Sequence, residues 1–159
     1  MKQVSLASIE KAIEKIDNLD EDGLERVAET FALAHPVLLG YAMSASEEYE
    51  NDNLQGLLIY YFCLLVESFN NEGASFNEIT EAVIEEFEEP FFDVLDSFFE
   101  TENLEDLEEY TDQPDLVKFM MAEISTPDVD GTELDDETAT QLFIVATAII
   151  ALLSKSIKA

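Results

Sequence analysis

Apolar residues recur every three or four positions along most of the chain, whereas alternating apolar and polar runs bounded by glycine-rich turns are absent. The first such repeat joins Leu6, Ile9, Ile13 and Ile16, with charged residues between them. This spacing places the apolar side chains on one face of an α-helix. The pattern therefore predicts an all-α protein.

The first half of the chain divides into four predicted helices. Asp20 offers an N-cap, Pro36 suits the first position of a helix, and the polar run that begins at Asn51 marks a break. With these signals, the apolar spacing predicts helices over about residues 5–19, 22–35, 36–49 and 54–69. The fourth carries the widest apolar face and is expected to be central.

Capping signals and prolines predict the helices of the second half. Ser75 with Glu78 three residues later forms a capping box, which predicts a helix that begins there and ends before Pro90. A helix with a phenylalanine stripe over residues 91–100 follows, because its aromatic residues repeat at helical spacing. Such a stripe is expected to be mostly core. Asn103 and Pro114 predict two further short helices.

The whole chain, residues 1–159, is expected to form a single acidic helical domain, a bundle or an irregular α-α array of about seven helices. Two segments repeat a helix, proline, helix layout, with Pro36 and Pro90 offset by 54 residues. A duplicated unit is therefore conceivable, although few residues are identical.

The last helix is expected to be capped by Asp135 or Asp136 and contains an uncharged stretch of 16 residues, Thr138 to Leu153. A membrane span needs about 20 apolar residues, and shorter stretches are more often buried core helices. We therefore expect a core helix and no association with a membrane.

Charge narrows the function classes. The chain has 7 Lys and Arg against 37 Asp and Glu, a formal net charge of -30, yet 47% of its residues are hydrophobic. This composition indicates a folded acidic protein rather than a disordered one. Direct binding of nucleic acid is disfavoured, because it requires a basic face. Cys63 is the only cysteine and resembles a core residue, which fits a cytoplasmic location.

Catalytic and metal motifs are sparse. His35 is the only histidine and precedes a proline, where interaction with a helix dipole explains it. The acids of residues 128–133 place their glycine at the wrong position for a calcium loop, so a turn is favoured there. We expect no cofactor, no metal and no catalytic residue, and keep a carboxylate-based enzyme only as an unlikely alternative.

The distribution of acids is the most informative feature, since residues 27–117 hold 23 Asp and Glu but no Lys or Arg. Like charges at helical spacing destabilise a helix slightly, so something other than stability favours them. The candidate partner-binding residues are Glu78, Glu81, Glu85, Glu88, Glu100 and Glu105, of which the first four form a row on one predicted helix.

These residues predict a non-enzymatic protein-protein interaction module that binds a basic surface of a partner protein. Three alternatives stay open: a nucleic-acid mimic that inhibits a DNA- or RNA-binding protein, a surface that only confers solubility, and a homodimer. The sequence does not identify the partner or the biological process.

Overall fold

The computed structural model describes residues 3–125 and 135–158, and this part of the chain is helical with no strand. The predicted all-α class is confirmed, and the described residues contain eight helices where about seven were expected. The helices are α1 (Leu6–Asp17), α2 (Glu21–Ala34), α3 (Pro36–Glu48), α4 (Leu54–Asn71), α5 (Glu81–Thr101), α6 (Leu104–Thr111), α7 (Pro114–Ser125) and α8 (Asp136–Lys155).

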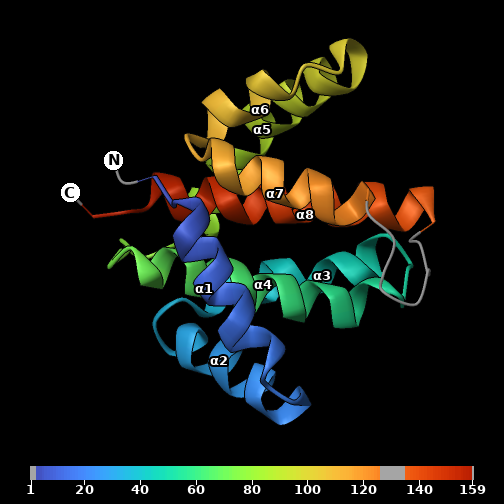
Figure 1. The fold of residues 1–159 in the computed structure, drawn as a ribbon. Helices are drawn as coiled ribbons and strands as arrows, with labels where there is room; N and C mark the ends of the chain where they lie inside the picture. Colours follow the sequence, from blue (N-terminus) through green and yellow to red (C-terminus); the bar gives the residue numbers. More distant parts are fainter. Residues whose placement is uncertain (1–2, 126–134, 159) are drawn as a thin grey trace.

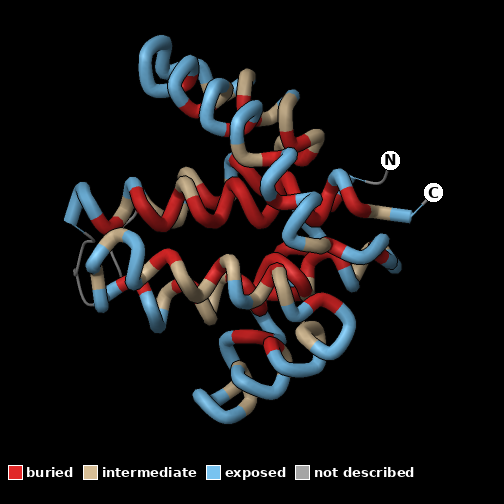
Figure 2. Tube along the Cα trace, turned by 180° about the vertical axis from the view of Figure 1, so that it is seen from behind, coloured by how far each residue is buried: buried red, intermediate tan, exposed pale blue. Residues whose placement is uncertain are grey.

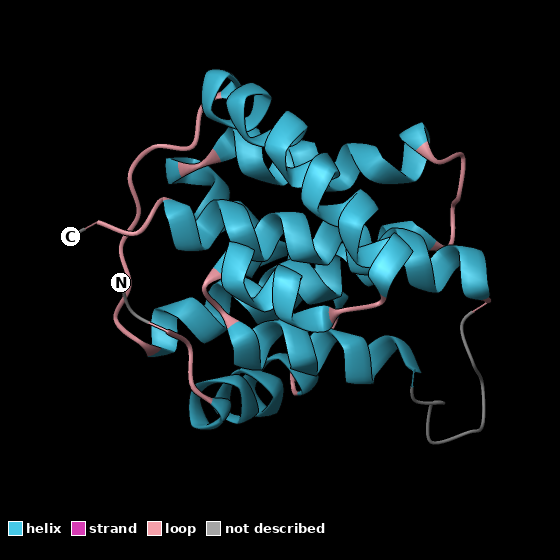
Figure 3. Cartoon of the chain, turned by 90° about the horizontal axis from the view of Figure 1, so that it is seen from above, coloured by secondary structure: helices cyan, strands magenta, loops and turns pink. Residues whose placement is uncertain are grey.

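Two helices organise the others (Figure 1). α4 contacts α1, α2, α3 and α8, while α8 also contacts α5, α6 and α7. The α5–α6 hairpin projects from one side of this centre and α2 lies at the opposite side (Figure 1). Seen from above, the described chain consists of helices joined by loops (Figure 3). The N-terminal and C-terminal ends of the chain lie on the same side of the molecule (Figure 3).

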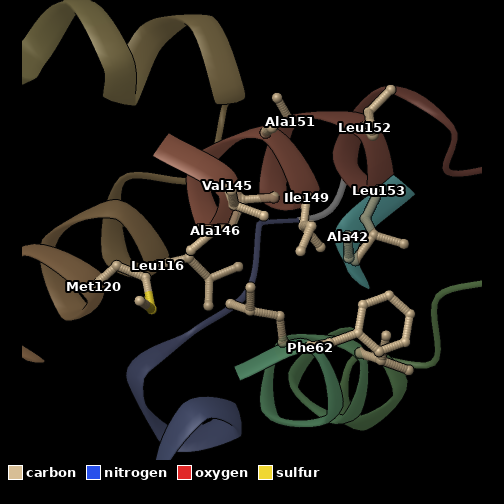
Figure 4. Packing of buried hydrophobic residues seen from close by; sticks show 14 of the residues in the cluster. Ala42, Phe62, Leu116, Met120, Val145, Ala146, Ile149, Ala151, Leu152 and Leu153 are labelled. Atoms are coloured by element: carbon tan, nitrogen blue, oxygen red, sulfur yellow. The ribbon is translucent and has the colours of Figure 1, made fainter. Parts of the chain in front are cut away.

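The core lies where α4 and α8 meet their neighbours, as predicted. Nearly all of α8 is buried, whereas the distal part of the α5–α6 hairpin is largely exposed (Figure 2). Ile149 and Ala146 of α8 point toward Leu116 of α7 and Phe62 of α4 (Figure 4). α8 is long and apolar enough to cross a membrane, but 78% of its most apolar window is buried inside the protein, as in a core helix.

Local capping chemistry sets most helix starts where they were predicted. The side chain of Asp20 accepts a hydrogen bond from the Gly23 amide at 2.8 Å, and Asp135 accepts one from the Thr138 amide at 2.7 Å. The Thr138 hydrogen bonds also lower the pKa of Asp135. Pro36 occupies the first turn of α3.

The predicted helix start at Ser75 is wrong. Residues 75–80 are not helical. Instead Phe76 forms an isolated antiparallel bridge with Ile157, and the Asn77 amide donates to the Ser156 carbonyl at 2.7 Å. Thr80 caps α5, accepting from the Val83 amide at 3.2 Å. Backbone pairing of residues 75–77 with residues 156–158 therefore takes the place of the predicted helix start.

The predicted break at Pro90 is also wrong, because α5 continues through it. A proline inside a helix removes one hydrogen bond, here to the carbonyl of Glu86. Pro90 is exposed, so water can reach that carbonyl, while Phe87 and Phe91 stack at 4.8 Å on the buried side. Since Pro36 begins a helix and Pro90 lies inside one, the duplicated layout is absent.

Candidate functional site: an acidic groove between α3 and α5

A groove of about 360 Å³ runs between α3 and the first half of α5. On α5, the buried side chain of Ile84 lies at the groove, and Glu81 and Glu88, about one turn before and after it, also line the groove. On α3, Gly40 leaves open space, since a Cβ there would meet no atom within 4 Å. The groove is lined by Val37, Gly40, Tyr41, Ser44, Glu81, Ile84, Glu85 and Glu88.

Three of the six predicted residues meet in this groove. Glu81 and Glu85 are exposed and Glu88 is half-buried. Glu81 lies in the first turn of α5, where the positive end of the helix dipole favours a carboxylate. The ion pairs that the structure shows, Lys15–Glu67 and Lys118–Glu108, involve no groove residue. Among the described residues, none of those that line the groove is a lysine or arginine, so the groove concentrates negative charge.

Tyr41 places a phenol among these carboxylates. Burial, together with the charges of Glu88 and Glu48, raises its pKa to about 12. Tyr41 therefore stays neutral and offers the groove a hydroxyl that can donate or accept a hydrogen bond.

The α3 side of the groove was not predicted. Sequence reasoning found the acids of α5 but gave no signal for Tyr41, Gly40 or Ser44, because nothing along the chain indicates that α3 faces α5. Only the spatial arrangement brings residues 37–44 and 81–88 together.

Glu78 does not belong to the helical row in which it was placed. It is exposed and precedes α5, in the extended segment that pairs with residues 156–158. Its charge raises the pKa of His35, and Glu78 is not among the residues that line the groove. Glu78 therefore lies toward a different recess.

Glu100 and Glu105 lie outside the groove lining. Both are exposed, Glu100 near the end of α5 and Glu105 in the first turn of α6. At 3.6 residues per turn, Glu100 is rotated by roughly 60° from Glu85 around α5. These two acids extend the negative surface along the hairpin without entering the groove.

Each pair of neighbouring phenylalanines on α5 divides between core and surface. Phe91 is fully buried and Phe98 lies against Phe143 at 5.9 Å, which confirms the core prediction for these two. Phe92 and Phe99 are 45% and 47% exposed. Both follow Glu85 at intervals of seven residues, two helical turns, so they share the face of α5 that carries this groove acid.

The described ranges 3–125 and 135–158 contain no group of three or more His, Cys, Asp or Glu side chains that could hold a metal ion. The calcium-like spacing of residues 128–133 lies outside the described residues. His35 lines a separate recess and does not meet the groove carboxylates.

Comparisons of the chain with protein-family models, with curated proteins and with solved structures find no match. Function is therefore inferred from the residues of the groove. Closely spaced carboxylates beside a neutral phenol suit the ammonium of a lysine or the guanidinium of an arginine, whose donors they accept.

Proposed function

We propose that the chain is a non-enzymatic interaction module that binds a basic surface of a partner protein through the acidic groove. A lysine or arginine of the partner enters between α3 and α5, where Glu81, Glu85 and Glu88 accept its hydrogen bonds. Phe92 and Phe99, farther along the same face of α5, contact apolar atoms beside that cation.

The two kinds of residue contribute differently to this association. Exposed ion pairs contribute about 0–1 kcal/mol each, so the carboxylates mainly raise the association rate and reject acidic partners. Aromatic side chains bury large apolar areas and supply most of the affinity at many interfaces. The observation that carries the proposal is the presence of both on one helix face, within a stretch that holds no cation.

A nucleic-acid mimic is the second candidate, and the regular row on α5 favours it. Glu81, Glu85 and Glu88 follow one another at about 6 and 4.5 Å along the axis at 1.5 Å rise per residue. A duplex carries one charge per about 1.7 Å of axis, so several helices would have to contribute. A copy of a phosphate backbone needs no exposed aromatic residues, which favours the first proposal.

A lysine placed inside the groove tests the proposal. Gly40 faces open space, so Gly40→Lys neutralises part of the groove, and the helix gains about 0.5–1 kcal/mol by losing a glycine. Gly56 is the matched control, because its Cβ also meets open space, on α4 beside Glu21, Glu25 and Asp52. Gly56→Lys thus makes the same charge change in another acidic recess.

The three proteins are used to capture partners from a native lysate, and retained proteins are compared. We expect a basic protein that the original chain and Gly56→Lys retain and that Gly40→Lys loses. Displacement of that protein by added DNA or RNA favours the mimic, and survival with nucleic acid present favours the interaction module. Equal retention by Gly40→Lys and Gly56→Lys contradicts both, because the groove then has no role.

A further inference from the structure

A second recess, whose lining differs chemically from that of the acidic groove, lies between α1, α2, α4 and the segment before α5. Its volume is about 560 Å³, within the range of about 300–1,000 Å³ typical of small-molecule sites. Much of its wall is apolar, with Val27, Phe31 and Phe76 among the contributors. Lys15, Arg26, His35 and one acid, Glu67, also line it, and because basic residues outnumber the acid we call it the cationic pocket.

His35 contributes an unsatisfied polar atom to this pocket. The residue is only 8% exposed, and its Nδ1 atom is buried without a hydrogen-bond partner. Its ring stacks on Phe31 at 4.8 Å and meets the edge of Phe76 at 6.0 Å. Buried polar atoms are nearly always paired in folded proteins, so this unpaired atom is an exception, and the ring that carries it lines the pocket.

The pocket also gathers positive charge in a strongly negative protein. The chain has seven lysines and arginines, of which Lys15 and Arg26 line the pocket and Lys158 lies near enough to lower the pKa of His35. Lys15 is paired with Glu67 at 3.1 Å. Arg26 belongs to neither ion pair that the structure shows and is exposed, so its guanidinium is available to an anion.

We propose that the cationic pocket binds a small aromatic molecule that carries one carboxylate. The aromatic body packs against Val27, Phe31 and Phe76, beside the ring of His35, and the carboxylate accepts hydrogen bonds from Arg26. Arg suits this role because its planar donors match a carboxylate in a bidentate geometry.

The net charge of the protein sets a condition on this ligand. Remote acids repel any anion, although salt screens them beyond about 10 Å. Apolar burial therefore has to supply most of the affinity. Arg26 makes the pocket bind an anion more tightly than its neutral analogue. A molecule with several negative charges is disfavoured.

Two fluorescent probes test both halves of the proposal. Anilinonaphthalene sulfonate carries two aromatic ring systems and one anionic group, and phenylnaphthylamine has the same rings without the sulfonate. The chain has no tryptophan, which reduces background emission, and one histidine, so the imidazole signals in an NMR spectrum belong to His35. We expect saturable binding of the anionic probe together with a shift of these signals.

Three variants locate the probe. Arg26→Glu is expected to weaken the anionic probe about tenfold and the neutral probe much less, as expected for a charge-assisted hydrogen bond. Lys118→Glu makes the same charge change on α7, outside the pocket, and is expected to leave both affinities nearly unchanged. Ala34 is exposed in the pocket wall, so Ala34→Trp fills the space and weakens both probes.

Three outcomes overturn the proposal: no saturable binding of the anionic probe, binding that leaves the His35 signals unmoved, or equal losses in Arg26→Glu and Lys118→Glu. Arg26, Ala34 and Lys118 are exposed, and a thermal unfolding curve for each variant verifies that the fold is retained. The acidic groove lies elsewhere, so Gly40→Lys is expected to bind both probes normally.

Discussion

The acidic groove and the cationic pocket are recesses of the same protein with opposite chemistry. The groove is lined by three carboxylates and a phenol. The pocket is lined by a lysine, an arginine, a histidine and a single carboxylate, that of Glu67, around an apolar wall. Net charge alone would make every recess negative. The comparison shows that the sign of a recess depends on which segments meet there, not on the total of -30.

The positions of the cations in the chain explain the difference. Every lysine and arginine lies at or before residue 26 or at or after residue 118. Both walls of the groove, residues 37–44 and 81–88, come from the cation-free stretch between these limits. The pocket joins α1 and α2, which hold Lys15 and Arg26, to α4 and the segment before α5.

Phe62→Ala should break the comparison most strongly, because Phe62 packs behind the wall of the cationic pocket. Phe62 is fully buried on α4 and its ring meets that of Phe31, a pocket residue, edge to face at 5.6 Å. We expect the free energy of unfolding to fall by about 3–5 kcal/mol, from lost burial and a cavity, as measured by urea denaturation. Anionic-probe binding should fall with it.

Phe92→Ala is the matched control for this change. It deletes the same atoms from a side chain that is about half exposed, so we expect a loss below about 1 kcal/mol. If the two variants lose similar free energies of unfolding, the packing of Phe62 against Phe31 does not stabilise the wall of the cationic pocket.

Charge reversal of the groove should produce the next largest effect. The triple variant Glu81→Lys, Glu85→Lys and Glu88→Lys is expected to slow association with a captured basic partner by about tenfold to a hundredfold and to flatten its salt dependence. Stopped-flow or surface-based kinetics at several salt concentrations measure both. The acids are exposed or half-buried, so the fold should persist.

Three acids outside the groove provide the control for this variant. Reversal of Glu10 and Glu14 on α1 and of Glu29 on α2 makes the same change in net charge at exposed positions. If both triple variants slow association equally, net charge rather than the groove steers the partner.

The pH dependence of stability should give the smallest effect, and it tests whether the pKa of His35 in the pocket wall is lowered. Burial lowers the pKa of His35 below 6.5, Glu78 raises it and Lys158 lowers it. Because the unfolded chain then binds a proton more readily than the folded one, the stability contribution of His35 is present above pH 6.5 and declines as the pH falls below it.

His35→Phe isolates this contribution, because its ring can stack on Phe31 but does not titrate. Relief of repulsion among the 37 acids on acidification occurs in both proteins and cancels in the difference. We expect the stability of the original chain, relative to His35→Phe, to decline between about pH 7 and 5. An increase would contradict a lowered pKa.

Local chemistry explains which parts of the fold were predictable. Caps act within a few residues, so Asp20, Asn103 and Asp135 marked helix starts in the sequence itself. The apolar faces of α4 and α8 were equally legible, because a helix that is apolar nearly all round has to be buried.

Two local signals failed because tertiary contacts outweighed them. The segment that begins at Ser75 lost its helix to backbone pairing of residues 75–77 with residues 156–158. The lost hydrogen bond at Pro90 did not end α5, since Phe87 and Phe91 continue the buried face across an exposed proline. The sequence does not show whether a backbone segment will form hydrogen bonds within a local helix or with a distant segment of the chain.

The sequence by itself determined the all-α class, most helix starts, the two most buried helices and the cation-free stretch that makes α5 acidic. Those features follow from local capping, apolar periodicity and charge, which act between near neighbours. Only the tertiary structure decided that α3 faces Glu81, Glu85 and Glu88, and that Arg26 and His35 line one pocket. Packing of distant helices fixes such encounters, and no short-range pattern in the chain encodes them.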